Sequence, residues 1–153
     1  MSYSFKSSGK TVTTTNDEKL SETTVPVGFA TPLSLGTTAL FKMNYTLAAQ
    51  VHDNLKNLLL TNFGERLCQY NFGANLKELV SEYTSQDDFD TEAINRIKTA
   101  VSSWMPYVDL ENFSSDVDRF NNTNTAIITI TITYNVPSLN VFGKKLEINL
   151  YAM

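Results

Sequence analysis

The chain has 153 residues, a formal net charge of −4 and a hydrophobic fraction of 42%, which predict one folded domain with a modest core. The acidic balance argues against non-specific binding to nucleic acid, because such binding normally needs a basic face. The single cysteine, Cys68, has no disulfide partner within these residues, and with a single histidine, His52, a zinc site is close to excluded. We expect no metal and no cofactor.

The N-terminal stretch differs in composition from the rest of the chain. Serine and threonine fill 11 of the first 25 positions, so this stretch buries too little apolar surface to offset its ordering entropy. Two interpretations stay open, a docking arm that a partner orders and a leader with no role. Its beginning, MSYSFKSSGK, lacks the apolar core of a signal peptide, and no apolar run approaches the roughly 20 residues of a membrane helix. We therefore expect a protein that is made in a cytoplasm and makes no membrane contact.

Proline and glycine recur in residues 25–40, which predicts an extended, turning segment on the domain surface. A strong helix is predicted over residues 45–60, where apolar residues recur at helical spacing. Asn44 or Thr46 can cap its start, and Gly64 suits the corner after its end. Its predicted buried stripe comprises Leu47, Val51, Leu55, Leu58 and Leu59.

Two further helices are predicted after this corner. The second begins at Asn75, which has the capping-box spacing to Glu78. Residues 84–90 then form a predicted acidic loop, and a third helix covers residues 91–104, with Trp104 on its core face. Pro106 ends that helix, because the residue before a proline is pushed out of helical conformation.

The pattern changes to a period of two from Tyr107 onward, which predicts strands over residues 107–113, 126–134 and 145–151. The first of these continues weakly toward Phe120. The predicted fold class is α+β: three N-terminal helices packed on a small antiparallel sheet that ends in a C-terminal β-hairpin, preceded by an extended N-terminal arm. The hairpin is either ordinary core structure or an edge to which a partner adds a strand, and one hairpin can do both.

The most informative stretch is residues 54–73, NLKNLLLTNFGERLCQYNFG. A helix closes on three leucines, and two aromatic–glycine corners then bracket the adjacent charges of Glu65 and Arg66. Glycine lets another backbone approach closely, so the pair can make intermolecular salt bridges from a rigid corner. A solvated surface pair worth little energy is the alternative, and these residues alone favour it.

No catalytic residue is predicted. A glycosidase needs two carboxylates that face each other across the substrate, and nothing in the spacing marks such a pair among the 16 acidic residues. His52 has no serine in a G-x-S-x-G elbow to activate, and we expect it on a helix flank. We expect Cys68 to be a small core residue.

The stretch NLKNLLLTNFGER (residues 54–66), followed by Phe72-Gly73 and Leu76, resembles the signature of the lysozyme-like baseplate wedge family of contractile phage tails, the sheath initiator family. Related proteins occur in type VI secretion baseplates and contractile bacteriocins. The resemblance covers residues 41–151, so we divide the chain into an extended Ser/Thr-rich N-terminal arm (1–40) and a baseplate wedge, or sheath initiator, domain (41–153). The chain departs from the family where Met105-Pro106-Tyr107 stands in place of the usual Glu-Pro-Arg, because both charges are absent.

The resemblance implies a structural joint and not an enzyme, assembled in the host cytoplasm into the tail baseplate of a virion. It implies baseplate wedge proteins and the tail sheath protein as partners, with tube or hub proteins as further candidates. The wedge-binding residues it implies are Gly64, Glu65, Arg66, Phe72, Gly73 and Pro106. The sheath-binding residues it implies, on strands that pair with the first sheath ring, are Ile128, Ile130, Ile132, Tyr134, Leu146, Ile148 and Leu150. A peptidoglycan-cleaving muramidase is the alternative, suggested by the family's lysozyme label.

Overall fold

The computed structural model describes residues 25–36, 39–82, 86–119 and 126–152. The chain divides into two compact units, Met1–Gln50 and Val51–Met153. Most of the predicted Ser/Thr-rich arm, residues 1–24, lies outside the described residues.

The described part of the first unit is a short β-ribbon with turning chain around it. Strand β1 (Gly28–Phe29) pairs antiparallel with β2 (Met43–Asn44). The ring of Phe29 packs edge-to-face on that of Phe41, with 5.9 Å between the ring centroids. The sequence predicted turning chain here but not this ribbon, because strands of two residues are too short to show an alternating pattern.

Helix α2 (Leu47–Leu60) forms where the apolar spacing predicted it. Its start is capped by Thr46, whose Oγ1 accepts the backbone N–H of Ala49 at 3.3 Å. Its last turn closes on Thr61, whose backbone N–H and hydroxyl both donate to the carbonyl of Asn57, at 3.1 and 2.6 Å. The predicted stripe is buried at Val51, Leu55, Leu58 and Leu59, whereas Leu47 is exposed.

Helix α3 (Leu76–Glu82) begins one residue after Asn75, which has a left-handed backbone with φ of 52°. The side chains of Asn75 and Glu78 are hydrogen-bonded to each other, while the backbone N–H of Asn75 donates to the carbonyl of Thr61. The spacing of the predicted capping box therefore brings these two side chains together at the start of α3.

Helix α4 (Gln86–Trp104) is longer than predicted, and the prediction of a loop over residues 84–90 is wrong for 86–90. Phe89 is buried in this added stretch and anchors it to the core. Acidic residues such as Asp88 are favourable near a helix N-terminus, so a stretch that looks like an acidic loop can also begin a helix. Arg96 then joins α4 to the start of α3, because its Nη1 donates to the carbonyl of Asn75 at 3.0 Å.

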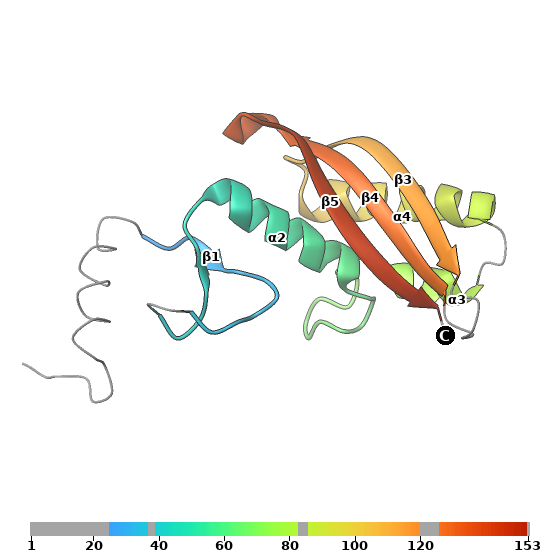
Figure 1. Cartoon of the computed structure of the whole chain (residues 1–153), viewed down its shortest axis with the longest axis horizontal. Helices are drawn as coiled ribbons and strands as arrows, with labels where there is room; N and C mark the ends of the chain where they lie inside the picture. The colour runs from blue at the N-terminus through green and yellow to red at the C-terminus, as the bar shows by residue number, and fades with distance from the viewer. Residues whose placement is uncertain (1–24, 37–38, 83–85, 120–125, 153) are drawn as a thin grey trace, which may run out of the picture. The chain divides into compact units, whose positions relative to one another are not determined.

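The C-terminal strands form one antiparallel sheet in the order β3–β4–β5, with β4 in the middle (Figure 1). Strand β3 covers Asp109–Arg119, β4 covers Ala126–Val136 and β5 covers Val141–Ala152. A short 3-10 turn, η1 (Pro137–Leu139), connects β4 to β5. The extra residue near the start of β5 is accommodated at Gly143, whose φ is +62° and whose N–H donates to Asn135 Oδ1 at 2.6 Å.

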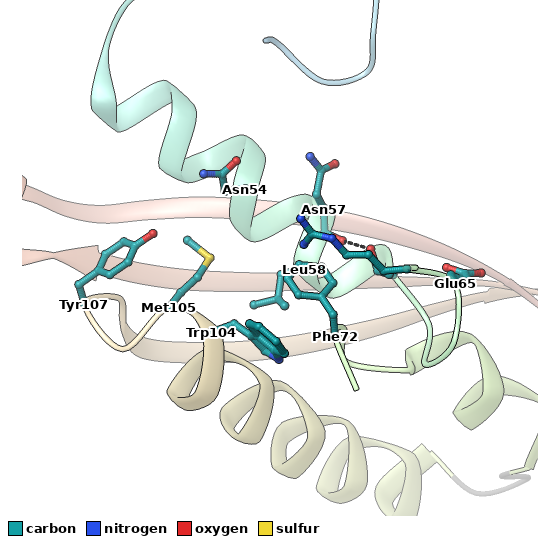
Figure 2. A pocket seen from close by; sticks show the side chains of 10 residues that line it. Asn54, Asn57, Leu58, Glu65, Phe72, Trp104, Met105 and Tyr107 are labelled. Carbon is teal, nitrogen blue, oxygen red and sulfur yellow. Dashed lines mark hydrogen bonds between the residues drawn. The ribbon is translucent and has the colours of Figure 1, made fainter. Parts of the chain in front are cut away.

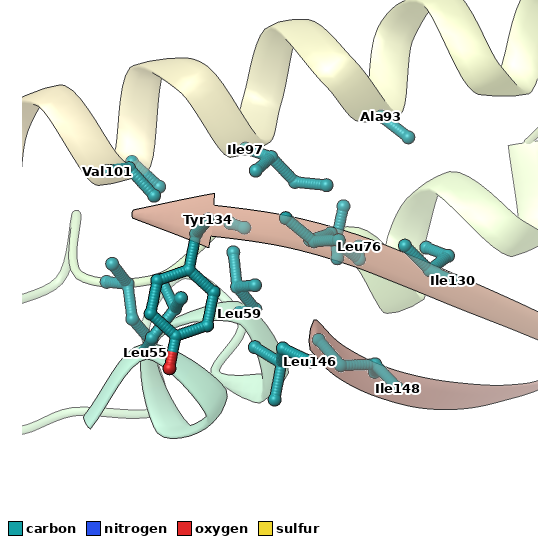
Figure 3. Packing of buried hydrophobic residues seen from close by; sticks show 14 of the residues in the cluster. Leu55, Leu59, Leu76, Ala93, Ile97, Val101, Ile130, Tyr134, Leu146 and Ile148 are labelled. Atoms are coloured by element: carbon teal, nitrogen blue, oxygen red, sulfur yellow. The ribbon is translucent and has the colours of Figure 1, made fainter. Parts of the chain in front are cut away.

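The core lies between the helices and one face of this sheet (Figure 3). Alternate residues of β4 and β5 enter it, and the pairing places Ile130 opposite Ile148 and Ile132 opposite Leu146. The sheet contributes Ile130, Ile132, Tyr134, Val136, Leu146, Ile148 and Leu150, and the helices contribute Leu55, Leu59, Leu76, Ile97 and Val101 among others. The α+β class is confirmed: the described residues hold three helices and two antiparallel sheets, with strands at the C-terminal end.

One polar pair lies at the edge of this core. His52 Nδ1 on α2 and the hydroxyl of Tyr134 on β4 are 2.9 Å apart. Burial lowers the pKa of His52, and it raises the pKa of the Tyr134 hydroxyl. His52 is thus half-buried on the flank of α2, with its ring joined to the sheet.

The shifted histidine predicts a stability that falls on mild acidification. The unfolded chain takes up a proton at His52 below its ordinary pKa, while the folded protein resists it, so the unfolded state binds more protons. The free energy of unfolding should therefore fall as pH drops through about 6.5 and level off below the lowered folded pKa. Urea unfolding measured across this pH range tests the prediction. The variant His52→Gln should reduce the dependence of the unfolding free energy on pH. The variant Tyr134→Phe should keep that dependence, because burial is the main cause of the lowered His52 pKa. Equal slopes in the wild type and His52→Gln would contradict the prediction.

Candidate functional site

The loop between α2 and α3, residues 61–75, is held rigidly by its own polar groups. The carboxylate of Glu65 accepts two hydrogen bonds from Asn62, one from the backbone N–H at 2.8 Å and one from Nδ2 at 2.9 Å. The N–H of Gly64 donates to the carbonyl of Tyr70 at 2.8 Å and closes the loop. The backbone hydrogen bond from Asn62, followed by that from its side chain, lowers the pKa of Glu65. Glu65 therefore stays ionised and shapes the turn.

Arg66 lies against an aromatic pair formed with the end of α4. Its guanidinium carbon is 4.3 Å from the centroid of the Phe72 ring, a cation–π contact. The Phe72 ring in turn meets Trp104 edge-to-face, with 5.1 Å between the centroids. Trp104 is 37% exposed, so its predicted place on the core face of the helix is wrong. It is the last residue of α4 and packs against the Phe72 ring of the loop instead.

A cleft of about 620 Å³ opens at this point (Figure 2). Its lining comes from α2, the loop and the chain after α4, and comprises Asn54, Asn57, Leu58, Thr61, Glu65, Arg66, Phe72, Trp104, Met105 and Tyr107. The floor is apolar, because Leu58 and Met105 are buried. The rim is partly aromatic and partly polar, since Trp104 and Tyr107 are partly exposed and the two asparagines lie on the outer face of α2.

The structure brings the wedge-binding residues that the resemblance implies to this one place. Glu65, Arg66 and Phe72 line the cleft, and Pro106 lies between two residues that line it. Gly64 and Gly73 set the backbone of the loop, with φ of +83° and +120°. Sequence reasoning missed Asn54, Asn57, Thr61, Leu58, Met105 and Tyr107 as site residues. A detectable signal was the pair of asparagines on the polar face of the helix immediately before the charged corner.

The tip of the loop is unusually apolar for exposed chain. Phe63, Leu67 and Tyr70 are 54%, 85% and 66% exposed. Cys68 is also exposed, so its predicted place in the core is wrong: it lies at the tip, with φ of +66°. Apolar side chains gathered on an outer loop are typical of a protein–protein contact.

The two loop glycines predict contrasting effects of a methyl group. A Cβ at residue 73 would collide with the carbonyl oxygen of Thr61, which Asn75 needs as a hydrogen-bond acceptor, whereas a Cβ at residue 64 meets open space. Gly64→Ala should cost about 1 kcal/mol for its left-handed backbone alone. Gly73→Ala should cost more than about 2 kcal/mol, because the loop must also move. Chemical denaturation of both variants measures the difference, and equal costs would contradict the geometry.

The residues that the resemblance implies to bind the sheath lie away from this cleft, in the core beneath the sheet. Ile130, Ile132, Tyr134, Leu146, Ile148 and Leu150 are buried in the subunit's own core, and Ile128 is partly buried against it. The backbone of β4 is paired on both sides, by β3 and β5. Within the described residues, β5 has a strand on one side only, so it keeps an outer edge of backbone N–H and C=O groups. The backbone of β5, and not these side chains, is therefore what a partner strand could reach.

The residues that line the cleft suit contacts with another protein better than they suit catalysis. Among the described residues that line the cleft, Glu65 is the acidic one, and its pKa is lowered, whereas a glycosidase acid needs a raised pKa and a second carboxyl group. The described part of the chain holds no cluster of three or more side chains suited to a metal ion. No helix in that part is long and apolar enough to cross a membrane.

The cleft with its charged and aromatic rim, the exposed apolar loop tip and, within the described residues, the β5 edge without a partner strand are features typical of surfaces that contact other proteins. The sequence profile of the family described as "Baseplate wedge protein gp25" matches residues 45–140, well over half of the chain. The chain belongs to this family, which confirms the resemblance seen in the sequence. It is a baseplate wedge-like structural protein of a contractile tail system, a class that assembles with other baseplate proteins.

Solved structures share the fold of this chain. A chain in the cryo-EM structure of the anti-feeding prophage baseplate matches with a TM-score of 0.59 and 19% identity, over 77% of this chain and 90% of that one. A Geobacter sulfurreducens protein described as a candidate tail lysozyme matches with a TM-score of 0.53 and 20% identity, over 70% of this chain and 90% of that one. At these identities the likeness concerns the fold alone. No curated protein matches the sequence significantly.

Proposed function

We propose that this subunit joins the baseplate wedge to the first ring of the tail sheath and templates sheath assembly by strand addition at β5. The observation that carries the proposal is the outer edge of β5, a strand of 12 residues paired on one side only within the described chain. Strand addition to such an edge gives affinity through main-chain hydrogen bonds and specificity through alternate side chains. The first sheath subunit would extend the sheet in this way, and later rings would repeat the linkage.

The side chains of β5 suit this role because they separate two tasks. Leu146, Ile148 and Leu150 are buried and fix the strand to its own subunit. The alternate residues Lys145 and Glu147 are exposed on the other face of the sheet. An added strand would place its own side chains next to these charges, which select the partner's sequence and register.

The wedge would be bound at the other surface, by the loop and cleft. Gly64 and Gly73 shape that loop, Glu65 fixes its turn, and Arg66 and Phe72 face the cleft. The exposed apolar tip of the loop adds contact area for a partner. A subunit held by the wedge through this surface would present β5 in a fixed orientation to the sheath.

Amide hydrogen exchange tests the strand-edge part of the proposal. In the free subunit, the β5 amides that point away from β4 should exchange fast, while their neighbours in the β4 ladder exchange slowly. In assembled tails the outward amides should become protected by about tenfold or more, because a sheath strand accepts their hydrogen bonds. Amides on the outer edge of β3 serve as the internal control and should not change. Fast exchange of the outward β5 amides in assembled tails would overturn strand addition.

A charge swap on β5 gives the matching genetic test. The double variant Lys145→Glu, Glu147→Lys keeps the net charge and alters exposed positions, so stability should stay within about 0.5 kcal/mol of the wild type. Tails should then carry incomplete or missing sheaths while the subunit still enters the baseplate. Asp116→Lys, on the opposite edge strand β3, is the control and should leave the sheath intact.

A muramidase activity is the second candidate, because one structure of similar fold is described as a candidate tail lysozyme. The lowered pKa of Glu65 speaks against its service as a general acid near neutral pH. Hydrolysis of purified peptidoglycan by the wild type, lost in a folded Glu65→Gln variant, would support the enzyme. The absence of turnover at high protein concentration would favour the structural joint.

A further inference from the structure

The two charged residues at the cleft, Glu65 and Arg66, differ in the contacts that they already make within the subunit. Both carboxylate oxygens of Glu65 already accept hydrogen bonds from Asn62. Within the described residues Arg66 forms no ion pair, and the Glu65 carboxylate is hydrogen-bonded to Asn62. The adjacent charges are therefore not paired with each other: the Glu65 carboxylate is fixed in the turn by neutral donors of Asn62, and the Arg66 guanidinium lies over the Phe72 ring.

The position of Arg66 suits a charged ligand. The Phe72 ring lies 4.3 Å from the guanidinium carbon, and Trp104 supports that ring from the side of α4. A guanidinium stacked on an aromatic face keeps its N–H groups at its edge, where they can bind both oxygens of a carboxylate. Stacking also limits the motion of the side chain, so less conformational entropy is lost when the ion pair forms.

The rest of the cleft favours a side chain from a protein over a free anion. Leu58 and Met105 make the floor apolar, and Trp104 and Tyr107 make the rim aromatic. A carboxylate attached to an apolar stem, as in aspartate or glutamate, fits this combination, because its methylene groups contact the floor while its charge meets Arg66. The chain as a whole carries a net charge of −4, so the attraction has to be local to the cleft.

We propose that the cleft binds an aspartate or glutamate side chain of a neighbouring baseplate protein, which pairs with Arg66 while Glu65 holds the turn. This inference rests on the proposed wedge-binding role of the same surface and adds the chemistry of the partner. It also gives the two charged residues different roles: Arg66 contacts the partner, and Glu65 is a positioning residue.

Binding of the full chain to the other baseplate proteins of its own tail particle, measured over a range of salt concentrations, tests the inference. Arg66→Gln should weaken binding about tenfold or more and should reduce the dependence of Kd on salt, because one interfacial ion pair is lost. Lys98→Gln removes a charge from an exposed site outside the cleft and should change neither quantity. If wild type binds and Arg66→Gln matches it in affinity and salt dependence, the carboxylate inference is overturned while the baseplate role stands. If the wild type does not bind these proteins, the proposed function fails with it.

Zero-length cross-linking identifies the partner group directly. In the Arg66→Lys variant, a water-soluble carbodiimide should join the amine at position 66 to a carboxyl group of a baseplate protein, and mass spectrometry should locate that amide bond. Reaction of that amine only with carboxyl groups of its own chain, in complexes where other lysines reach the partner, would overturn the inference.

Discussion

Deletion of residues 145–153 is expected to unfold the subunit, not merely to detach it from a partner. This segment carries Leu146, Ile148 and Leu150, all buried, and forms most of the β5 ladder with β4. Truncation of one buried leucine or isoleucine to alanine typically costs about 2–5 kcal/mol. The free-energy cost of removing three such side chains is as large as the whole free energy of unfolding of a typical domain, about 5–15 kcal/mol. Far-UV circular dichroism and thermal unfolding of the deletion variant should show no cooperative transition.

A surface variant on the same strand provides the control. Asn149→Ala removes an exposed side chain and should leave the unfolding free energy within about 0.5 kcal/mol of the wild type. A deletion variant that still unfolds cooperatively would show that β5 is dispensable for the core, contrary to the burial of its side chains. The result also decides how the sheath contact can be studied. If the deletion variant is unfolded, tails that lack a sheath would reflect that unfolding and not a lost contact. Amide hydrogen exchange and surface charge swaps are then the informative experiments.

Strand alternation was the part of the fold most readable from the sequence. Isoleucine and threonine alternate through β4, and the structure places Ile130 and Ile132 in the core with the threonines on the opposite face. The same alternation could not show which strand lies at the edge. Sheet order depends on pairing between distant segments, so the alternation could not rank the strands, and the resemblance implied sheath contacts from both β4 and β5. Within the described residues, β4 is central and β3 and β5 are the two edge strands, so β5 keeps one edge without a partner strand.

The start of α4 illustrates why polarity alone misplaces a helix boundary. Residues 86–90 are mostly polar or acidic, and a loop was the natural prediction. Phe89 is the exception, and its burial against distant parts of the chain makes the added turn stable. Tertiary contacts of this kind commonly override local preference, and a single apolar residue carries too little periodic signal to announce them.

The sequence allowed some residues of the cleft to be predicted, but not which distant segments of the chain meet there. Glu65, Arg66 and Phe72 belong to one sequence stretch, so their proximity could be expected. Met105 and Tyr107 come from the chain after α4 and reach the same place through packing of that helix. Trp104 was misassigned for the same reason: helical spacing put it in line with Val101, but α4 ends there and the side chain meets the loop.

The Phe72 ring links stability and recognition at this cleft, so its removal should affect both. Phe72→Ala takes away the ring beneath Arg66 and the edge-to-face partner of Trp104. Because Phe72 is only partly buried, the loss of unfolding free energy should be about 2–3 kcal/mol, below the roughly 3–5 kcal/mol typical of fully buried aromatics. Trp104 is the single tryptophan of the chain, so the emission of the folded variant should shift to longer wavelength as that side chain becomes more exposed. Binding to baseplate proteins should weaken with it.

Phe72→Leu separates the two effects. Leucine keeps most of the apolar volume, so the stability loss should stay below about 1.5 kcal/mol. It offers no aromatic face, however, and the cation–π contact of Arg66 contributes about 0.5–1 kcal/mol at an exposed site. If recognition depends on an oriented guanidinium, Phe72→Leu should weaken binding while its thermal unfolding stays near that of the wild type. Full binding by Phe72→Leu would mean that the ring only fills space, and Arg66 would then find its partner without the aromatic face.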